Sequence, residues 1–190
     1  MLVRDRLTVL LYAALGMLGF LLNGIGAILA PLQEQLRVSR AEVAFYPSLF
    51  AIALVITGLV GGPFVRRVGH RVGLVAAITG QIAGALLLAS SVRVLTLIGS
   101  ARRGAARRGA ARLGSARLGL GSALIIQLVP AALGARHPRF TTAVLGEANA
   151  VSSFASLLAP AAAAVAGAIG LGVGWAARYL LPVLPVAVAL

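Results

Sequence analysis

The chain has 190 residues, of which 60% are hydrophobic and only 11% are charged. This composition is too apolar for a soluble globular domain, and it predicts an all-α integral membrane protein with about six transmembrane helices. The formal net charge of +13 comes from arginine alone, because the sequence contains no lysine and only four acidic residues. The absence of cysteine excludes disulfide and thiol chemistry.

The first long apolar run covers residues 9–32 and is interrupted only by Asn23. At 1.5 Å per residue, this run is long enough to cross about 30 Å of hydrocarbon. Arg4 and Arg6 precede it, but the run is too long for a signal peptide, so we interpret it as helix one with the N-terminus inside. Asn23 is polar at mid-depth, and either an interhelical hydrogen bond or a contact to a solute would explain it.

Two further apolar runs, residues 43–65 and 72–91, predict helices two and three. Ser39 followed by Glu42 is the capping-box spacing, which predicts that Ser39 is the N-cap of helix two. Gln81 lies near the middle of helix three. As with Asn23, helix-to-helix bonding and a solute contact are the two interpretations of this side chain.

Between these helices, residues 62–71 form a short basic stretch bounded by Gly62 and Gly69. An arginine costs about 2.5–3.5 kcal/mol when inserted at the centre of a membrane helix, so we expect the chain to surface here as a cytoplasmic turn. The two glycines would let the helix ends approach closely. The arginines of this turn are Arg66, Arg67 and Arg71.

From residue 101 the sequence consists of four copies of a five-residue unit, ARRGA, ARRGA, ARLGS and ARLGL. A five-residue step advances about 140° beyond a full helical turn, so the arginines would spiral around the axis and form no single face. With a glycine in every unit, we expect residues 93–117 to be a flexible, low-complexity insertion. The repeat contains six arginines: Arg102, Arg103, Arg107, Arg108, Arg112 and Arg117.

The arginine content of this insertion permits two explanations. With the N-terminus inside, the predicted loops contain seven arginines inside and ten outside, which violates the positive-inside rule. Without five of the repeat arginines, five remain outside and the rule is obeyed. An expanded loop is therefore one explanation. A basic arm that binds nucleic acid is the other. No aromatic residue that could stack on bases is interleaved with the arginines, so we expect no nucleic-acid partner.

The rest of the chain predicts helices four, five and six over residues 118–133, 141–169 and 176–190. Residues 1–92 and 118–190 thus form two helical segments on either side of the insertion. The sixth helix is short for a membrane span, so we expect the C-terminus to be truncated. Gln127 in helix four and Asn149 in helix five are polar at membrane depth.

Glu147 is the only acidic residue within any of these apolar runs. A lone carboxylate at membrane depth is a candidate functional group. A structural clamp to arginines of the neighbouring internal loops and a proton-carrying carboxylate whose pKa is raised by burial are the two interpretations. They make opposite predictions for Glu147→Gln, namely loss of fold and abundance, or normal abundance with lost pH-dependent transport.

The basic turn resembles the loop between the second and third helices of the major facilitator superfamily, Gly-x-Leu-x-Asp-Arg-x-Gly-Arg-Arg/Lys. Arg66 occupies the position of the aspartate in that pattern. In helix four, Arg117 followed four residues later by glycine resembles a family pattern whose arginine is tied to proton transfer. The matching residues of the turn are Gly62, Arg67, Gly69 and Arg71.

This resemblance implies one six-helix half of a transporter, which would need a second half or a homodimer partner and would work by alternating access. We therefore expect a secondary transporter, or a fragment of one, in the cytoplasmic membrane that moves a small organic solute. Glu147 and Arg117 are the candidates for proton coupling. The candidates for the solute cavity are Asn23, Gln81, Gln127 and Asn149.

The alternative is a non-transporting truncated membrane protein or a scaffold whose basic segment binds anionic membrane lipid. Enzyme activity is not expected, because no Ser/His/Asp arrangement and no metal-ligand cluster is present in the sequence. The two histidines, His70 and His137, both lie in basic loops. We expect no cofactor and no metal.

Overall fold

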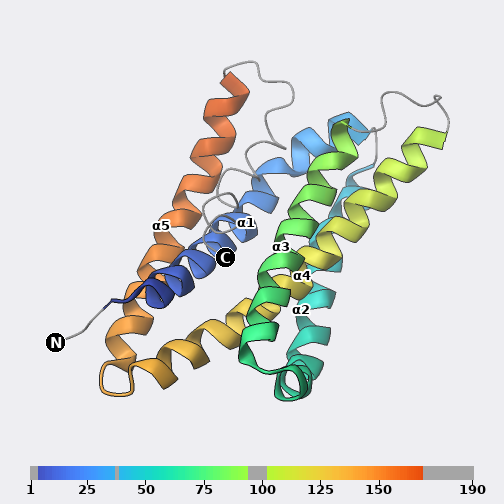
Figure 1. Cartoon of the computed structure of the whole chain (residues 1–190). Helices are drawn as coiled ribbons and strands as arrows, with labels where there is room; N and C mark the ends of the chain where they lie inside the picture. Colours follow the sequence, from blue (N-terminus) through green and yellow to red (C-terminus); the bar gives the residue numbers. More distant parts are fainter. Residues whose placement is uncertain (1–3, 37–38, 94–101, 169–190) are drawn as a thin grey trace.

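The computed structural model describes residues 4–36, 39–93 and 102–168, and all of their regular structure is helical (Figure 1). The all-α prediction is confirmed for these residues. The predicted sixth helix, residues 176–190, lies outside them. The helices are α1 (Arg6–Leu36), α2 (Arg40–Val68), α3 (His70–Arg93), α4 (Arg102–Arg136) and α5 (Thr141–Ala168).

The helices form two groups, α1 with α5 and α4 with α2 and α3, which α4 connects. Helix α1 packs along α5, while α4 packs against both α2 and α3 and also contacts α1. The start of α1, the α2–α3 turn and the α4–α5 turn lie at the same end of the bundle, at the bottom of Figure 1. We call this end the turn end.

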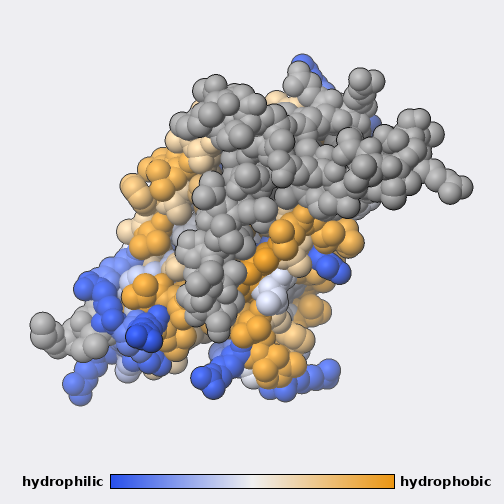
Figure 2. All heavy atoms as spheres, turned by 45° about the horizontal axis from the view of Figure 1, so that its top comes forward, coloured by the Kyte–Doolittle hydropathy of each residue, from blue (hydrophilic) through white to orange (hydrophobic). Residues whose placement is uncertain are grey.

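Among the described residues, four helices, α1 to α4, are long and apolar enough to cross a membrane, which indicates an integral membrane protein. Helix α2 exposes a largely apolar face, which would be a liability in water and suits contact with lipid. Where Figure 2 colours the surface, hydrophobic side chains cover much of it, and most of the hydrophilic ones lie along its lower edge. Six large apolar side chains of α2 are at least half exposed: Phe45, Ile52, Val55, Ile56, Leu59 and Val60.

The predicted capping box is confirmed at the start of α2. The Ser39 hydroxyl accepts a hydrogen bond from the Glu42 backbone N–H at 3.2 Å, and the Glu42 carboxylate accepts one from the Ser39 backbone N–H at 3.1 Å. These bonds satisfy two N–H groups that have no partner within the helix. Helix α2 therefore begins at Arg40, three residues before the predicted start at residue 43.

The ten-residue basic turn predicted over residues 62–71 is wrong in extent, since α2 continues to Val68 and α3 begins at His70. Gly69 alone reverses the chain, with φ of +85°, a conformation that glycine adopts without steric cost. Arg66 and Arg67 occupy the last turn of α2, where the negative end of the helix dipole favours cations.

Gly62 does not provide the close helix approach that we expected of it, because it lies inside α2 with only the end of the Arg66 side chain nearby. The close approach occurs at Gly73 in α3. A Cβ at Gly73 would lie 3.2 Å from a methyl carbon of Val65 and 3.2 Å from one of Leu128. Gly73 therefore lets α3 pack against α2 and α4 just above the turn.

The arginine repeat is helical from Arg102, so the predicted flexible insertion over residues 93–117 is wrong for this part. Alanine is the best helix former and arginine is among the good ones, and this propensity outweighs the cost of one glycine per unit. The third and fourth units also enter the bundle, where Gly114, Ser115 and Leu118 are buried. Helix four therefore starts well before the predicted residue 118.

Glycines of the repeat and of the residues after it set the spacing between α4 and its neighbours. A Cβ at Gly119 would lie 2.5 Å from the carbonyl oxygen of Phe50 in α2. A Cβ at Gly121 would lie 2.6 Å from the carbonyl oxygen of Ala77 in α3. Small residues at such positions allow backbones to approach in lipid, where packing drives helix association.

Glycines also allow α1 to pack closely against α5. A Cβ at Gly19 would lie 2.4 Å from the carbonyl oxygen of Ser152, and one at Gly16 would lie 3.1 Å from a methyl carbon of Val151. By contrast, Gly26 has nothing within 4 Å of its Cβ position. The contact between these helices is therefore tightest over the half of α1 nearer the turn end.

Candidate functional site

At the turn end, Glu147 joins α5 to α1 and to the segment before it. The Arg4 guanidinium donates two hydrogen bonds to the carboxylate, at 3.0 and 2.5 Å, and the Tyr12 hydroxyl donates a third at 2.9 Å. Two bonds from one arginine form the bidentate arrangement that carboxylates favour. The clamp interpretation expected an arginine of the internal loops, but the structure pairs Glu147 with the arginine that precedes α1.

A second group of polar side chains lies beside the first. Arg136, at the end of α4, forms an ion pair with Asp5. Asp5 also accepts hydrogen bonds from the Thr8 hydroxyl at 2.6 Å and from the Thr8 backbone N–H at 3.1 Å, which caps the start of α1. Because the Thr8 hydroxyl donates its only hydrogen to Asp5, its oxygen accepts from Nε2 of His137, 2.9 Å away.

Neither Asp5 nor Tyr12 was among the residues that the sequence singled out for function. An N-cap signal was nevertheless present, because an aspartate followed three residues later by threonine directly precedes the first apolar run. The arginine partners of Asp5 and Glu147 were not visible in the sequence, since they lie more than 125 residues away in the chain. Together the two ion pairs connect the start of α1 to α4 and α5.

We expect Asp5 to make stability depend on acid pH. The hydrogen bonds from Arg136 and Thr8 hold the pKa of Asp5 well below its usual range. Its stabilising contribution is therefore complete above the ordinary pKa of about 3.9 and is lost as the pH falls toward the lower pKa of the folded state. Thermal unfolding in detergent, measured from about pH 6 to about pH 3, should show a falling transition temperature.

Asp5→Asn is the matched control for this dependence. The variant should have a lower transition temperature near neutral pH, because the ion pair with Arg136 is gone. Its further decrease in acid should be smaller than that of the wild type. Parallel pH curves for the two proteins would contradict the role of Asp5.

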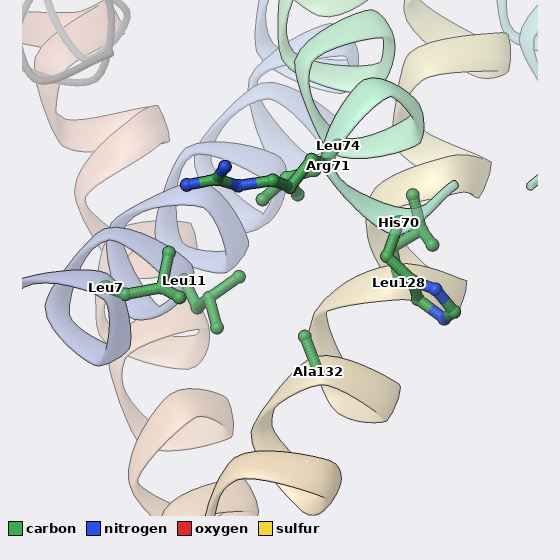
Figure 3. Close-up of a pocket in the computed structure, with 7 residues that line it drawn as sticks. All are labelled: Leu7, Leu11, His70, Arg71, Leu74, Leu128 and Ala132. Carbon is green, nitrogen blue, oxygen red and sulfur yellow. The ribbon is translucent and has the colours of Figure 1, made fainter. Parts of the chain in front are cut away.

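A cavity of about 170 Å³ lies next to this network, between α1, α3 and α4 (Figure 3). Five of its seven lining side chains are aliphatic, and Leu11 and Leu128 are almost completely buried. His70 and Arg71 are the polar members. The lining residues are Leu7, Leu11, His70, Arg71, Leu74, Leu128 and Ala132.

The four polar residues expected to line a solute cavity do not share one site. Gln81 is fully buried and donates to the Ser122 hydroxyl at 2.9 Å, across the α3–α4 contact. Gln127 donates to the Thr57 carbonyl oxygen at 3.3 Å, across the α2–α4 contact. Both therefore make the interhelical bonds expected of polar side chains in membrane helices.

The other two candidates lie elsewhere. Asn23 is exposed and donates to the carbonyl oxygen of Gly19 in its own helix, at 3.2 Å, where we had expected a bond to another helix or to a solute. Asn149 is exposed on α5. None of the four lines the cavity at the turn end.

The structure also separates the two candidates for proton coupling. Arg117 is exposed on α4, and about 28 Å of helix lies between it and the end of α4. Glu147 lies near that end, two turns into α5. Of the loop-motif residues, only Arg71 borders the cavity, while Arg66 and Arg67 are exposed and do not line it. Within the described residues, no three His, Asp or Glu side chains are placed to hold a metal ion.

Comparison with known proteins identified no relative of this chain. No protein-family model, curated protein or solved structure matches the chain. Its function therefore has to be inferred from the arrangement of its own residues.

Proposed function

We propose that the chain is one helical half of a secondary transporter of the major facilitator type, which moves a small organic solute by alternating access. Glu147 is the observation on which this proposal depends. Its carboxylate is about one-third exposed and is bonded both to Arg4 and to Tyr12 of α1. A carboxylate that can reach water and also holds two helices together links a change of protonation to a change of packing.

The proposed coupling follows from these bonds. The bonds from Arg4 and Tyr12 stabilise the charged carboxylate, not the neutral form that burial was expected to favour, so Glu147 takes up a proton only when Arg4 moves away. Protonation then leaves Arg4 without its charged partner and gives one carboxylate oxygen an O–H donor. The α1–α5 contact loses its charged connection at the turn end, while the glycine contacts around Gly19 remain. The bundle would thus open at this end and stay packed further along.

The proposed orientation places the turn end in the cytoplasm. The helix ends at the turn end and the segment before α1 contain arginines at the edges of the membrane spans, which is where the positive-inside rule applies. The first arginines of the repeat lie on the part of α4 that precedes its apolar span, Arg112–Arg136, and this part is the end of α4 far from the turn end. Transporters of this type consist of two halves, so we propose a second copy or another six-helix half as the partner.

Glu147→Gln tests the proposal directly. We expect near-normal abundance in the membrane, because ion pairs with exposed partners contribute little to stability and Arg4 is more than half exposed. We expect loss of pH-driven transport, because glutamine cannot exchange a proton. The measurement is accumulation of fluorescent apolar dyes, cationic and anionic, in proteoliposomes with an imposed pH gradient.

Tyr12→Phe is the matched control, since it removes one hydrogen bond to Glu147 and leaves the carboxylate titratable. It should retain pH-driven accumulation. The size of the wild-type complex in detergent is the second measurement, and a stable dimer is expected. A monomer that accumulates no dye, or a Glu147→Gln variant that is absent from the membrane, would contradict the proposal and favour a non-transporting membrane protein that contacts anionic lipid.

A further inference from the structure

We propose that the cavity between α1, α3 and α4 binds a small amphiphilic carboxylate whose anionic group is held by Arg71. The apolar part of this ligand would be about the size of one benzene ring. The proposal concerns binding at the turn end and does not depend on transport.

The volume and the lining of the cavity define the apolar part of the ligand. An aliphatic cavity of about 150 Å³ stays dry and accepts benzene, so 170 Å³ is enough for one aromatic ring. Leu11 and Leu128 present buried aliphatic surface, and Leu74 and Ala132 complete the wall. These aliphatic side chains offer no partners for the hydroxyl groups of a sugar, whose burial against them would be costly.

Arg71 supplies the charge. It lies in the first turn of α3, and Figure 3 shows its side chain reaching across the space between α3 and α1. The His70 ring points away from this guanidinium, along the side of α4. Arg71 is therefore the cation placed over the cavity, and its five N–H donors match a carboxylate.

Neither of the two acids that the structure describes at the turn end is available to neutralise Arg71. Asp5 is bonded to Arg136 and Thr8, and Glu147 is bonded to Arg4 and Tyr12. Among the described residues, the structure gives Arg71 no ion pair. A cation without a carboxylate partner, beside a largely aliphatic cavity, is complementary to a ligand that has both an anionic and an apolar part.

The surroundings strengthen the attraction for an anion. Helix α3 begins at His70, so the positive end of its dipole lies beside the two polar residues that line the cavity. Arg66 and Arg67 at the end of α2 add further positive charge. Leu7 is 40% exposed, so the cavity is bordered by a side chain that solvent reaches.

Binding of 4-fluorobenzoate to the purified full chain in neutral detergent, followed by fluorine NMR, tests the proposal. The neutral analogue 4-fluorobenzamide has the same ring and lacks the charge. We expect saturable binding of the benzoate and about tenfold weaker binding of the amide, because a hydrogen bond to a charged group is lost. Arg71→Gln should weaken benzoate binding about tenfold and leave amide binding unchanged.

Two further variants separate the parts of the site. Arg67→Gln removes an arginine at the end of α2 that does not line the cavity, and it should weaken benzoate binding far less than Arg71→Gln does. Ala132→Leu should weaken the binding of both probes, because the added carbons occupy the apolar space. Arg71 is exposed, so its variant is expected to fold, and equal unfolding temperatures would establish this.

Three results would overturn the proposal. Equal affinity for 4-fluorobenzoate and 4-fluorobenzamide would show that the site does not recognise the negative charge of the ligand. If Arg67→Gln weakened benzoate binding as much as Arg71→Gln, the attraction would come from the overall positive charge of the turn and not from Arg71 itself. Displacement of benzoate by anionic lipid in mixed micelles, in the wild type and not in Arg71→Gln, would identify lipid as the occupant.

Discussion

Gly121→Ala is expected to destabilise the bundle by about 1–2 kcal/mol. The new methyl group would lie 2.6 Å from the carbonyl oxygen of Ala77 and 2.7 Å from the backbone nitrogen of Gln81. Both are backbone atoms of α3, which cannot move aside as a flexible side chain would. Overpacking of this kind costs about 1–3 kcal/mol, and the better helix propensity of alanine returns up to about 1 kcal/mol.

Gly109→Ala is the matched control in the same helix. Gly109 is exposed, and nothing lies within 4 Å of its Cβ position. The substitution should therefore stabilise α4 by up to about 1 kcal/mol. Thermal unfolding in one detergent compares the two variants. A shift of both transition temperatures in the same direction would contradict the close α3–α4 contact.

Ser122→Ala is expected to be the second large effect, at about 1–2 kcal/mol. Gln81 is completely buried, and its Nε2 donates to the Ser122 hydroxyl. Its Oε1 has no hydrogen-bond partner among the described residues. Removal of the hydroxyl leaves the buried amide without a partner among the described residues. An unpaired buried polar group costs about 1–3 kcal/mol, with interhelical bonds in membranes at the lower end.

Gln81→Met, which keeps the length of the side chain and removes the amide, provides the complementary measurement. We expect this variant to be near neutral, because it also removes the unpaired Oε1 and because a helical serine can bond to a carbonyl of its own helix. The double variant Gln81→Met, Ser122→Ala should recover most of the stability lost in Ser122→Ala. A greater cost for Gln81→Met than for Ser122→Ala would show that the amide stabilises the contact in another way.

The arginine repeat shows where reasoning from periodicity fails. Its five-residue step forms no amphipathic face, so the pattern predicted a flexible insertion. A helix does not need such a face when its glycines and small residues pack against neighbours on two sides, as Gly119 and Gly121 do against α2 and α3. Sequence periodicity does not reveal which helices will be adjacent, and adjacency decides the outcome here.

The sequence by itself determined the features that depend on a few neighbouring residues. The apolar runs are long enough, as helices, to cross a bilayer, and they predicted membrane helices. The Ser39–Glu42 capping box predicted the start of α2, because its bonds join residues only three apart. Only the tertiary structure decided the partner of Glu147 and the position of Arg71 over a cavity of three helices. Those arrangements join segments far apart in the chain, and long-range packing, which no local pattern encodes, brings them together.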